Sequence, residues 1–158
     1  MMSKCRLLTL GAGLLATATI SWAQNASNWR SYKVADGLPE TIVSSVAVGP
    51  HGNVWVKHLN AESISCLDGY DVKTIPSPGL GNNRIYESAG GQIWTVAAEG
   101  LQQYKDDGWV HYSVPEISAE LRRNTLSLFR PIPLYPIKQN HVLFLVPDGL
   151  MEFNADDP

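Results

Sequence analysis

The segment Val46-Ala-Val-Gly-Pro-His-Gly-Asn-Val-Trp55-Val recurs later in the chain as Ile85-Tyr-Glu-Ser-Ala-Gly-Gly-Gln-Ile-Trp94-Thr. Each copy reads as an apolar strand, a glycine-containing turn and a second strand that carries a tryptophan. The tryptophans are about 40 residues apart, and a repeat of ~40–45 residues with four short strands has the period of a β-propeller blade. Such a unit cannot bury its apolar face alone, so the repeat predicts neighbouring blades stacked on one another.

The rest of the chain follows the same rhythm, and we predict an all-β fold of four-stranded antiparallel propeller blades that form an incomplete propeller. The predicted divisions are a signal peptide (1–23), an orphan outer strand and linker (24–40), blade A (41–81), blade B (82–115) and a partial blade C (116–158). The predicted strands are 29–32; 43–48, 53–57, 64–67 and 70–75 in blade A; 84–88, 92–97, 101–104 and 109–112 in blade B; and 125–129, 141–146 and 150–153 in blade C.

Two stretches of blade C do not fit the four-strand pattern. Residues 118–123 predict a single helical turn or a loop. Pro131, Pro133 and Pro136 predict a break in the strands, because proline cannot donate a hydrogen bond to a strand ladder.

The two ends of the pattern are both incomplete. Trp29-x-x-Tyr32 repeats the Trp109-x-x-Tyr112 signature of the fourth strand of blade B, so it predicts a fourth strand whose first three strands lie elsewhere. Blade C ends after its third predicted strand, which leaves an edge that folded proteins avoid. Known propellers close with four to eight blades. We therefore expect the chain to be a fragment of a longer protein.

The first 23 residues have the layout of a secretory signal peptide. Lys4 and Arg6 precede an apolar run over residues 7–20, and Ser21-Trp22-Ala23 resembles a cleavage site. The run is shorter than the ~20 apolar residues that span a bilayer. The sequence thus predicts cleavage after Ala23, export to the periplasm or the extracellular space, and no membrane-spanning segment in the mature chain.

The net charge argues against some classes of binding partner, and the cysteine content limits the disulfides that can form. The chain carries a net charge of −3, and loss of Lys4 and Arg6 with the leader makes it more acidic. An acidic chain without a basic cluster argues against binding to nucleic acid or to anionic membranes. Cys5 also leaves with the leader, so Cys66 is left alone and cannot form an internal disulfide. Within the strand predicted over 64–67, we expect Cys66 to be buried and structural.

Several motifs together resemble the two-component regulator propeller repeat. They are Trp29-x-x-Tyr32 with Asp36-Gly-Leu-Pro39, Val43-Ser-Ser-Val46, Gly52-Asn-Val-Trp55, Gly100-Leu101 behind Trp94, and Gly149-Leu150. The sequence departs from that family where Lys57-His58 stands in place of a small pair, where Leu143 replaces the tryptophan and where Ser63 replaces a glycine.

Members of that family are typically periplasmic sensor regions of membrane-bound histidine kinases and related signalling proteins. The resemblance implies an N-terminal input region that binds an oligosaccharide or another small molecule, with remaining blades and downstream signalling domains outside this chain. It lends no kinase activity to these residues, and we predict that the chain itself is not an enzyme. Two alternatives stay open: a secreted propeller lyase of the streptogramin-lyase type, a family that relies on a histidine-centred site with magnesium, and a secreted binding or scaffold propeller.

The individual candidate residues favour structural roles. At a repeated blade position, Trp55 and Trp94 predict packing between blades rather than stacking on a sugar ring. Trp29, Tyr32, Trp109 and Tyr112 are expected to shield outer strands.

The polar candidate residues do not form a pattern typical of a catalytic or metal-binding site. No two of His51, His58, His111 and His141 have metal-ligand spacing, and the acidic pairs Asp106-Asp107 and Asp156-Asp157 lack the spacing of a calcium loop. We predict no catalytic residue, no cofactor and no metal ligand, and leave the ligand-binding residues unassigned. His58, in a loop predicted after the second strand of blade A, is the polar residue we single out as an unusual contact.

Overall fold

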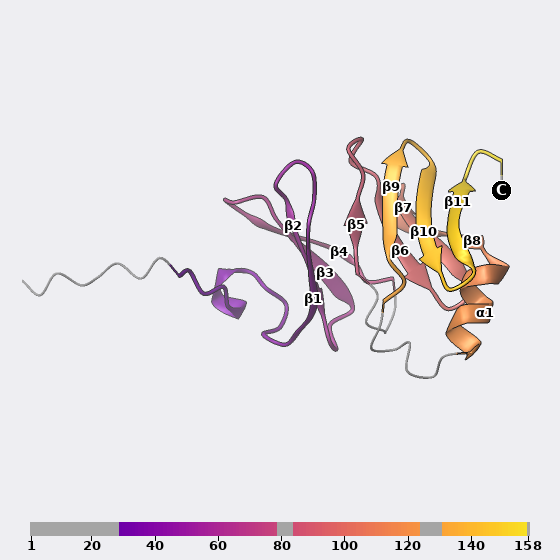
Figure 1. Ribbon diagram of the computed structural model, residues 1–158. Coiled ribbons are helices and arrows are strands. Elements are labelled where there is room, and N and C mark those ends of the chain that lie inside the picture. Colours follow the sequence, from indigo (N-terminus) through magenta and orange to yellow (C-terminus); the bar gives the residue numbers. More distant parts are fainter. Residues whose placement is uncertain (1–28, 79–83, 124–130, 158) are drawn as a thin grey trace, which may run out of the picture. The chain divides into compact units, whose positions relative to one another are not determined.

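Short runs of alternating apolar residues, separated by tight turns, fold into antiparallel sheets in this chain. The computed structural model describes residues 29–78, 84–123 and 131–157. In that part of the chain three sheets follow one another in sequence order (Figure 1), and every pair of neighbouring strands is antiparallel. The predicted all-β fold of propeller blades is therefore confirmed.

Two of the sheets have four strands and the third has three. Blade A contains β1 (Val43–Val48), β2 (Val54–His58), β3 (Ser63–Leu67) and β4 (Val72–Pro76) in spatial order β1-β2-β3-β4. Blade B contains β5 (Tyr86–Glu87), β6 (Ile93–Ala97), β7 (Gly100–Lys105) and β8 (Gly108–Ser113) in the same kind of order. Blade C contains β9 (Leu134–Lys138), β10 (His141–Val146) and β11 (Gly149–Asn154), with β10 in the middle.

The core lies between the blades. Trp55, Ile64 and Ile85 form the buried cluster where blade A meets blade B. A larger cluster joins blade B to blade C, and Trp94, Leu101 and Val142 are fully buried in it. Blade-to-blade contact is thus the main way in which this chain removes apolar surface from water.

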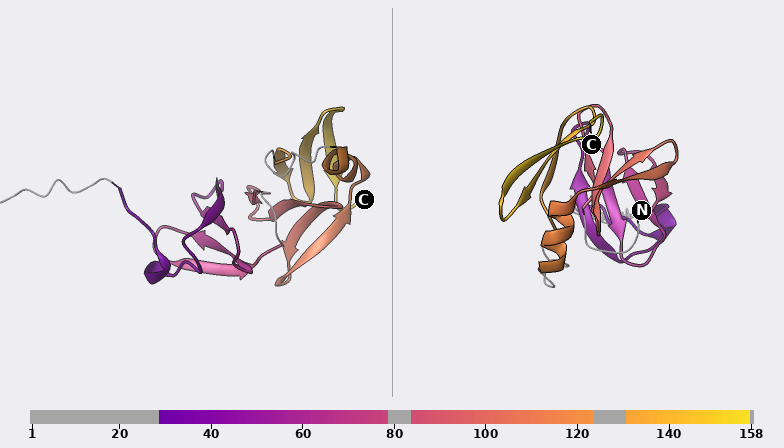
Figure 2. Two further views of the ribbon diagram at one scale, coloured as in Figure 1. Left: turned by 90° about the horizontal axis from the view of Figure 1, so that it is seen from below. Right: turned by 90° about the vertical axis from the view of Figure 1, so that its right-hand side faces the viewer.

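One helix covers the junction of blades B and C. Helix α1 (Pro115–Arg123) begins with proline, whose fixed φ suits the first helical position. It packs against β7 and β10 (Figure 2). Its own residue Ile117 is fully buried. The prediction of one helical turn or a loop at 118–123 therefore underestimated this element.

The proline-rich stretch was predicted wrongly. Residues 134–138 form strand β9 although Pro136 lies in it, opposite Val142 of β10. Strand β9 is at the edge of its sheet, where a missing N–H costs no ladder hydrogen bond on the open side. The first strand predicted for blade C, at 125–129, lies outside the described residues.

The N-terminal prediction also needs correction. Residues 29–32 form no strand, and they lead into a short 3₁₀ helix, η1 (Val34–Asp36), which ends at Gly37 with φ of 102°. His58, predicted in a loop, is the last residue of β2. In blades A and B the eight predicted strands are all present, with ends displaced by a few residues.

Gly100 provides a test of this packing. Its φ is +149°, and a Cβ there would collide with the Tyr112 carbonyl oxygen and lie 2.5 Å from the Val114 nitrogen. Both atoms belong to backbone that cannot move independently. Gly100→Ala should therefore lower the free energy of unfolding by about 3–4 kcal/mol in denaturant titration.

Gly52→Ala is the matched control, because Gly52 also has a positive φ but a Cβ added there would meet no atom within 4 Å. Its expected cost is only the left-handed backbone conformation, about 1–2 kcal/mol. Equal losses in the two variants would contradict the close approach at Gly100.

Candidate functional site

The outer face of blade A is apolar and largely open. Side chains alternate across a strand, so Val54 and Val56 of β2 share one face with their pairing partners Val48 and Val46 of β1. Val46 is 53% exposed and Val48 is 71% exposed. The opposite face of the same sheet, which carries Trp55, is buried against blade B.

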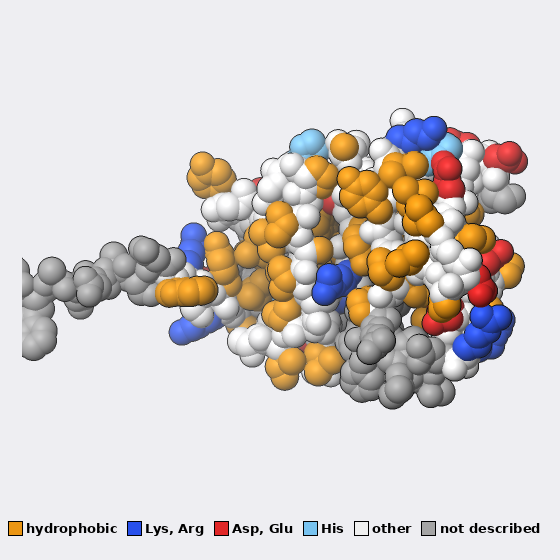
Figure 3. Space-filling model, viewed as in Figure 1, with side chains coloured by type: hydrophobic (Ala, Val, Ile, Leu, Met, Phe, Trp, Pro, Cys, Tyr) orange, Lys and Arg blue, Asp and Glu red, His pale blue; other side chains and the backbone are white. Residues whose placement is uncertain are grey.

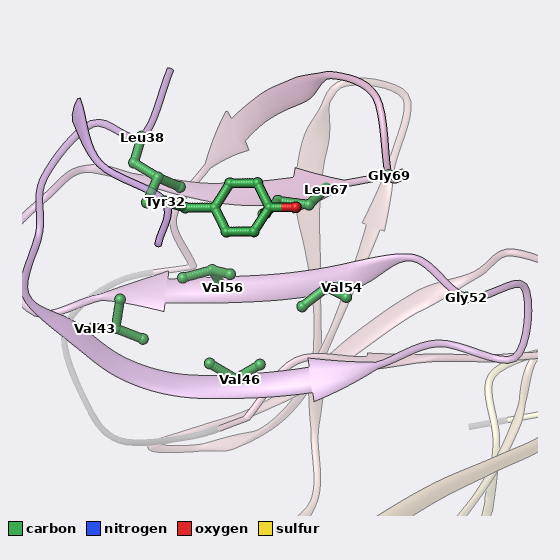
Figure 4. Close-up of a pocket in the computed structure, with 9 residues that line it drawn as sticks. All are labelled: Tyr32, Leu38, Val43, Val46, Gly52, Val54, Val56, Leu67 and Gly69. Atoms are coloured by element: carbon green, nitrogen blue, oxygen red, sulfur yellow. The ribbon is translucent and has the colours of Figure 1, made fainter. Parts of the chain in front are cut away.

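This face is hollowed by a cavity of about 330 Å³. Its lining residues are Tyr32, Leu38, Val43, Val46, Gly52, Val54, Val56, Leu67 and Gly69 (Figure 4). The Tyr32 ring lies near Leu38 and Leu67 in this view, and Leu38 packs in one cluster with Val56 and Leu67. No charged side chain lines the cavity, so it suits apolar surface such as the side chains of another blade.

A buried polar pair lies at the end of the same face. His58 Nε2 and Ser65 Oγ share a hydrogen bond of 2.9 Å, and both residues are buried. His58 Nδ1 has no hydrogen bond of good geometry among the described residues, although the Glu40 carbonyl lies near the ring. A buried nitrogen without a partner is costly and rare, so His58 is the least satisfied polar group on this face.

Glu40 sits beside this pair and closes the adjoining turn. Its carboxylate accepts hydrogen bonds from the backbone nitrogens of Asn60, at 2.7 Å, and of Ala61, at 3.2 Å. The hydrogen bond from Asn60 is the main cause that holds the pKa of Glu40 below its ordinary value. The side chain of Glu40 is therefore a negative charge at neutral pH.

Burial and Glu40 act on His58 in opposite directions. Burial lowers the pKa of His58, and the nearby Glu40 charge and carbonyl offset only part of that shift. The imidazole is thus neutral at pH 7 and can exchange a proton with a hydroxyl. Because Ser65 is fully buried, a substrate can reach its hydroxyl only if the covering chain moves.

Lys57 is a polar residue whose burial the sequence reasoning missed. It is 4% exposed and lies between Val56 and His58 in β2, on the face that meets blade B. Burial lowers the pKa of the Lys57 amine, and no described carboxylate lies within ion-pair distance of it. The sequence feature that could have indicated the burial of Lys57 is its position as a charged residue inside an otherwise apolar strand.

The two repeated tryptophans are packed, as predicted. Trp55 is 6% exposed and Trp94 is fully buried, each in a cluster between blades. The Trp55 Nε1–H donates to Glu87 of blade B at 2.7 Å. Trp94 Nε1, in contrast, has no partner among the described residues.

The remaining histidines are separate from His58. His51 contacts the Ala89 carbonyl at 2.9 Å, His111 lies 3.8 Å from Glu99, and His141 Nδ1 lies 3.0 Å from Glu152. Among the described residues no three side chains of the types His, Cys, Asp and Glu gather closely enough to hold a metal ion.

The other residues considered from the sequence have ordinary positions. Asp106 and Asp107 adopt positive φ in the turn between β7 and β8. Asp156 accepts a hydrogen bond from Asn140. Cys66 is half-buried rather than fully buried, and burial raises the pKa of its thiol. In the described residues no helix combines the length and apolar character required to cross a bilayer.

Comparison with known proteins gave a structural likeness only. No family model matches the chain, and no curated protein matches it. A catalytically inactive virginiamycin B lyase from Staphylococcus aureus with quinupristin is similar in structure, with a TM-score of 0.41 and 13% identity. The selenomethionine-substituted form of that lyase has a TM-score of 0.40 and 19% identity. In both cases the match covers 77% of this chain and 44% of the lyase, so the chain spans less than half of the lyase's length.

This comparison corrects one prediction. The chain was predicted not to be an enzyme, yet the solved structures that it resembles are those of a lyase. The prediction of a non-enzymatic chain is therefore contradicted and is withdrawn. No family model supports the specific two-component regulator propeller family.

The burial of His58 predicts a pH dependence of stability. Because the folded protein holds the pKa of His58 below 6.5, the unfolded chain takes up this proton first as the pH falls. The free energy of unfolding should thus decrease as the pH falls below about 6.5, with a slope under about 1.4 kcal/mol per pH unit. Denaturant titrations between pH 7 and pH 5 measure it.

His58→Gln should flatten this dependence, whereas His51→Gln, which changes an exposed histidine, should leave it in place. An unchanged slope in His58→Gln would show that another group is responsible.

Proposed function

We propose that this chain supplies consecutive blades to an exported β-propeller that binds a small molecule. The observation that carries the proposal is a pair of equivalent surfaces on two blades. The surface of blade B that faces blade C is buried, whereas the corresponding surface of blade C is open. Val96 and Leu101 of blade B are 3% and 0% exposed against blade C, whereas the residues at the same register positions of blade C, Leu145 and Leu150, are 49% and 65% exposed.

The open surface of blade C is continuous. Tyr135 and Leu145 stand out on it, and hydrophobic side chains gather over β9 to β11 in the space-filling view (Figure 3). The open face of blade A is also apolar. The first and the last of the three described sheets therefore each expose an apolar face. Exposed apolar surfaces of this kind mark sites of association, and here they match the surface by which blades already stack.

The binding role and the export rest on the sequence. The signal peptide over residues 1–23 supports export, and the repeat motifs around Trp55 and Gly100 support the input region of a signal-transducing sensor. In such a protein the ligand would be an oligosaccharide or another small molecule, and the output would lie in domains beyond these blades.

A lyase is the second candidate function. The observation that favours it is His58, a buried neutral imidazole bonded to a hydroxyl at 2.9 Å with a carboxylate beside it. Such a group can take a proton from a substrate carbon or heteroatom. The lyase structures that resemble this chain include one with quinupristin, which supplies a substrate to test.

Ligand binding is tested by thermal unfolding of the exported protein, whose first residue should be Gln24. A ligand that binds only the folded state stabilises it by about 2.7 kcal/mol at a hundredfold excess over its Kd. We expect at least one member of an oligosaccharide panel to raise the Tm by several degrees. If neither the panel nor quinupristin shifts the Tm, the binding proposal fails.

Lytic activity is tested by incubation with quinupristin and measurement of the products by mass spectrometry. If the chain is a lyase, His58→Ala should lower turnover by at least about a hundredfold, the usual scale for loss of a general base. His51→Ala, which changes an exposed histidine, is the control and should retain full turnover. Binding of quinupristin without any turnover would exclude this second candidate.

A further inference from the structure

Lys57 carries an amine that is buried between two blades without a counter-ion. The residue is 4% exposed and pairs with Ile64 of β3, so its side chain stands on the face of blade A that packs against blade B. Among the described residues no carboxylate lies within ion-pair distance of the amine. A buried ammonium without a partner is costly, so Lys57 would gain from a negatively charged group on a ligand.

The carboxylate that blade B contributes to this interface is committed to other donors. Glu87 accepts hydrogen bonds from Trp55 Nε1 at 2.7 Å and from Asn53 Nδ2 at 3.3 Å. Asn53 stands just before the start of β2, whereas Lys57 is the last residue but one of that strand. Glu87 therefore binds toward the opposite end of β2 and leaves Lys57 unpaired.

Blade B presents a second unsatisfied group to the same interface. Gln102 of β7 pairs with Thr95 of β6, and Thr95 shares its face with Ile93, which packs against the cluster of Trp55. Gln102 therefore faces blade A. Its Oε1 atom is buried and has no hydrogen-bond partner in the part of the chain that the structure describes. The Thr95 hydroxyl donates to the Arg84 carbonyl at 2.9 Å, so it does not supply the missing donor.

The two unsatisfied groups stand at similar levels in their blades. Lys57 lies two residues beyond the repeated tryptophan of blade A, and Thr95, the partner of Gln102, lies one residue beyond the repeated tryptophan of blade B. Equivalent positions of stacked blades lie at similar levels, because each blade repeats the same unit. The register thus assigns the Lys57 amine and the Gln102 amide oxygen to the same part of the interface.

This part of the interface lies close to an exposed edge of both blades. Leu59, just after β2, is 49% exposed, and Asn60 is exposed as well. In blade B, Ala98 and Glu99 are exposed in the turn between β6 and β7. Glu99 lies 3.8 Å from the His111 ring and is largely exposed, so water screens its charge. A small molecule can therefore approach both unsatisfied groups from this edge.

One class of small molecule supplies both missing partners. A carboxylate pairs with an ammonium, and a hydroxyl donates to an amide oxygen. A sugar acid carries a carboxylate and several hydroxyls on one ring, whereas a neutral sugar leaves the Lys57 amine unpaired. Burial lowers the pKa of the Lys57 amine, and a bound carboxylate would offset that shift.

We propose that the interface between blades A and B binds an acidic sugar, whose carboxylate pairs with Lys57 and whose hydroxyl donates to Gln102. Binding at this place presupposes the proposed binding role of the chain and adds the class of ligand. Because both blades lie within the described residues, the site is independent of the total number of blades.

The test compares two forms of one sugar by titration calorimetry on the exported chain. The probe is digalacturonic acid, and its methyl ester is the matched neutral ligand, which keeps every ring hydroxyl. The dissociation constant of the acid should be at least about tenfold lower than that of the ester, the scale expected for a hydrogen bond to a charged group.

Two substitutions remove the site and keep the packing. Lys57→Met preserves the length of the side chain without its charge, and should weaken binding of the acid to the level of the ester. Gln102→Glu supplies an internal carboxylate for Lys57 and should weaken binding of the acid by at least about tenfold. Both changes end the unpaired burial of the amine, so neither should lower the Tm. Lys105→Met removes an exposed lysine and is the control, which should bind the acid normally.

Equal binding of the acid and the ester, or acid binding that Lys57→Met and Gln102→Glu leave unchanged, would overturn this site and leave the proposed binding role standing. If Lys57→Met lowers the Tm, Gln102→Glu decides the outcome. Binding of neither form would also overturn the site, and a shift of the Tm by a neutral oligosaccharide would then still support the proposed function.

Discussion

The packing of one sheet on the next, centred on the tryptophan of the second strand, is the constraint on which the rest of this structure depends. Trp55 fills the space between blades A and B and bonds to Glu87 on the far side. A Cβ at position 49 would collide with the Glu87 carboxylate, so a larger residue there would displace the side chain that accepts the Trp55 hydrogen bond. A sheet of four short strands has too little core of its own, so the contact between sheets provides the stability that each sheet lacks.

Strands in which apolar and polar residues alternate, and which end at glycine turns, could be predicted from the sequence. Strand β1 was predicted with its observed ends, and Trp55 and Trp94 were correctly taken as packing residues, because a large aromatic that repeats at the blade period has few other uses. Strand β9 was missed because Pro136 argues against a strand unless its edge position is known. Edge position is a property of the assembled sheet and cannot be read from one segment.

The polar site was harder to predict for the same reason. His58 and Ser65 meet because β2 and β3 pair in one particular register, and a shift of one residue would turn His58 to the other face. The burial of Lys57 likewise depends on blade B lying against it. His58 was singled out from the sequence as unusual, but its hydrogen bond, its unpaired nitrogen and its lowered pKa came only from the three-dimensional arrangement.

Pro136 makes the two edge strands of blade C differ in their capacity to pair with another strand. Blade C has two edges, and on one of them, β9, proline interrupts the row of N–H groups that another strand would need. The other edge, β11, has no proline between Gly149 and Asn154 and offers a regular ladder. Among the described residues, the β11 edge of blade C is therefore better suited than the β9 edge to pairing with another strand.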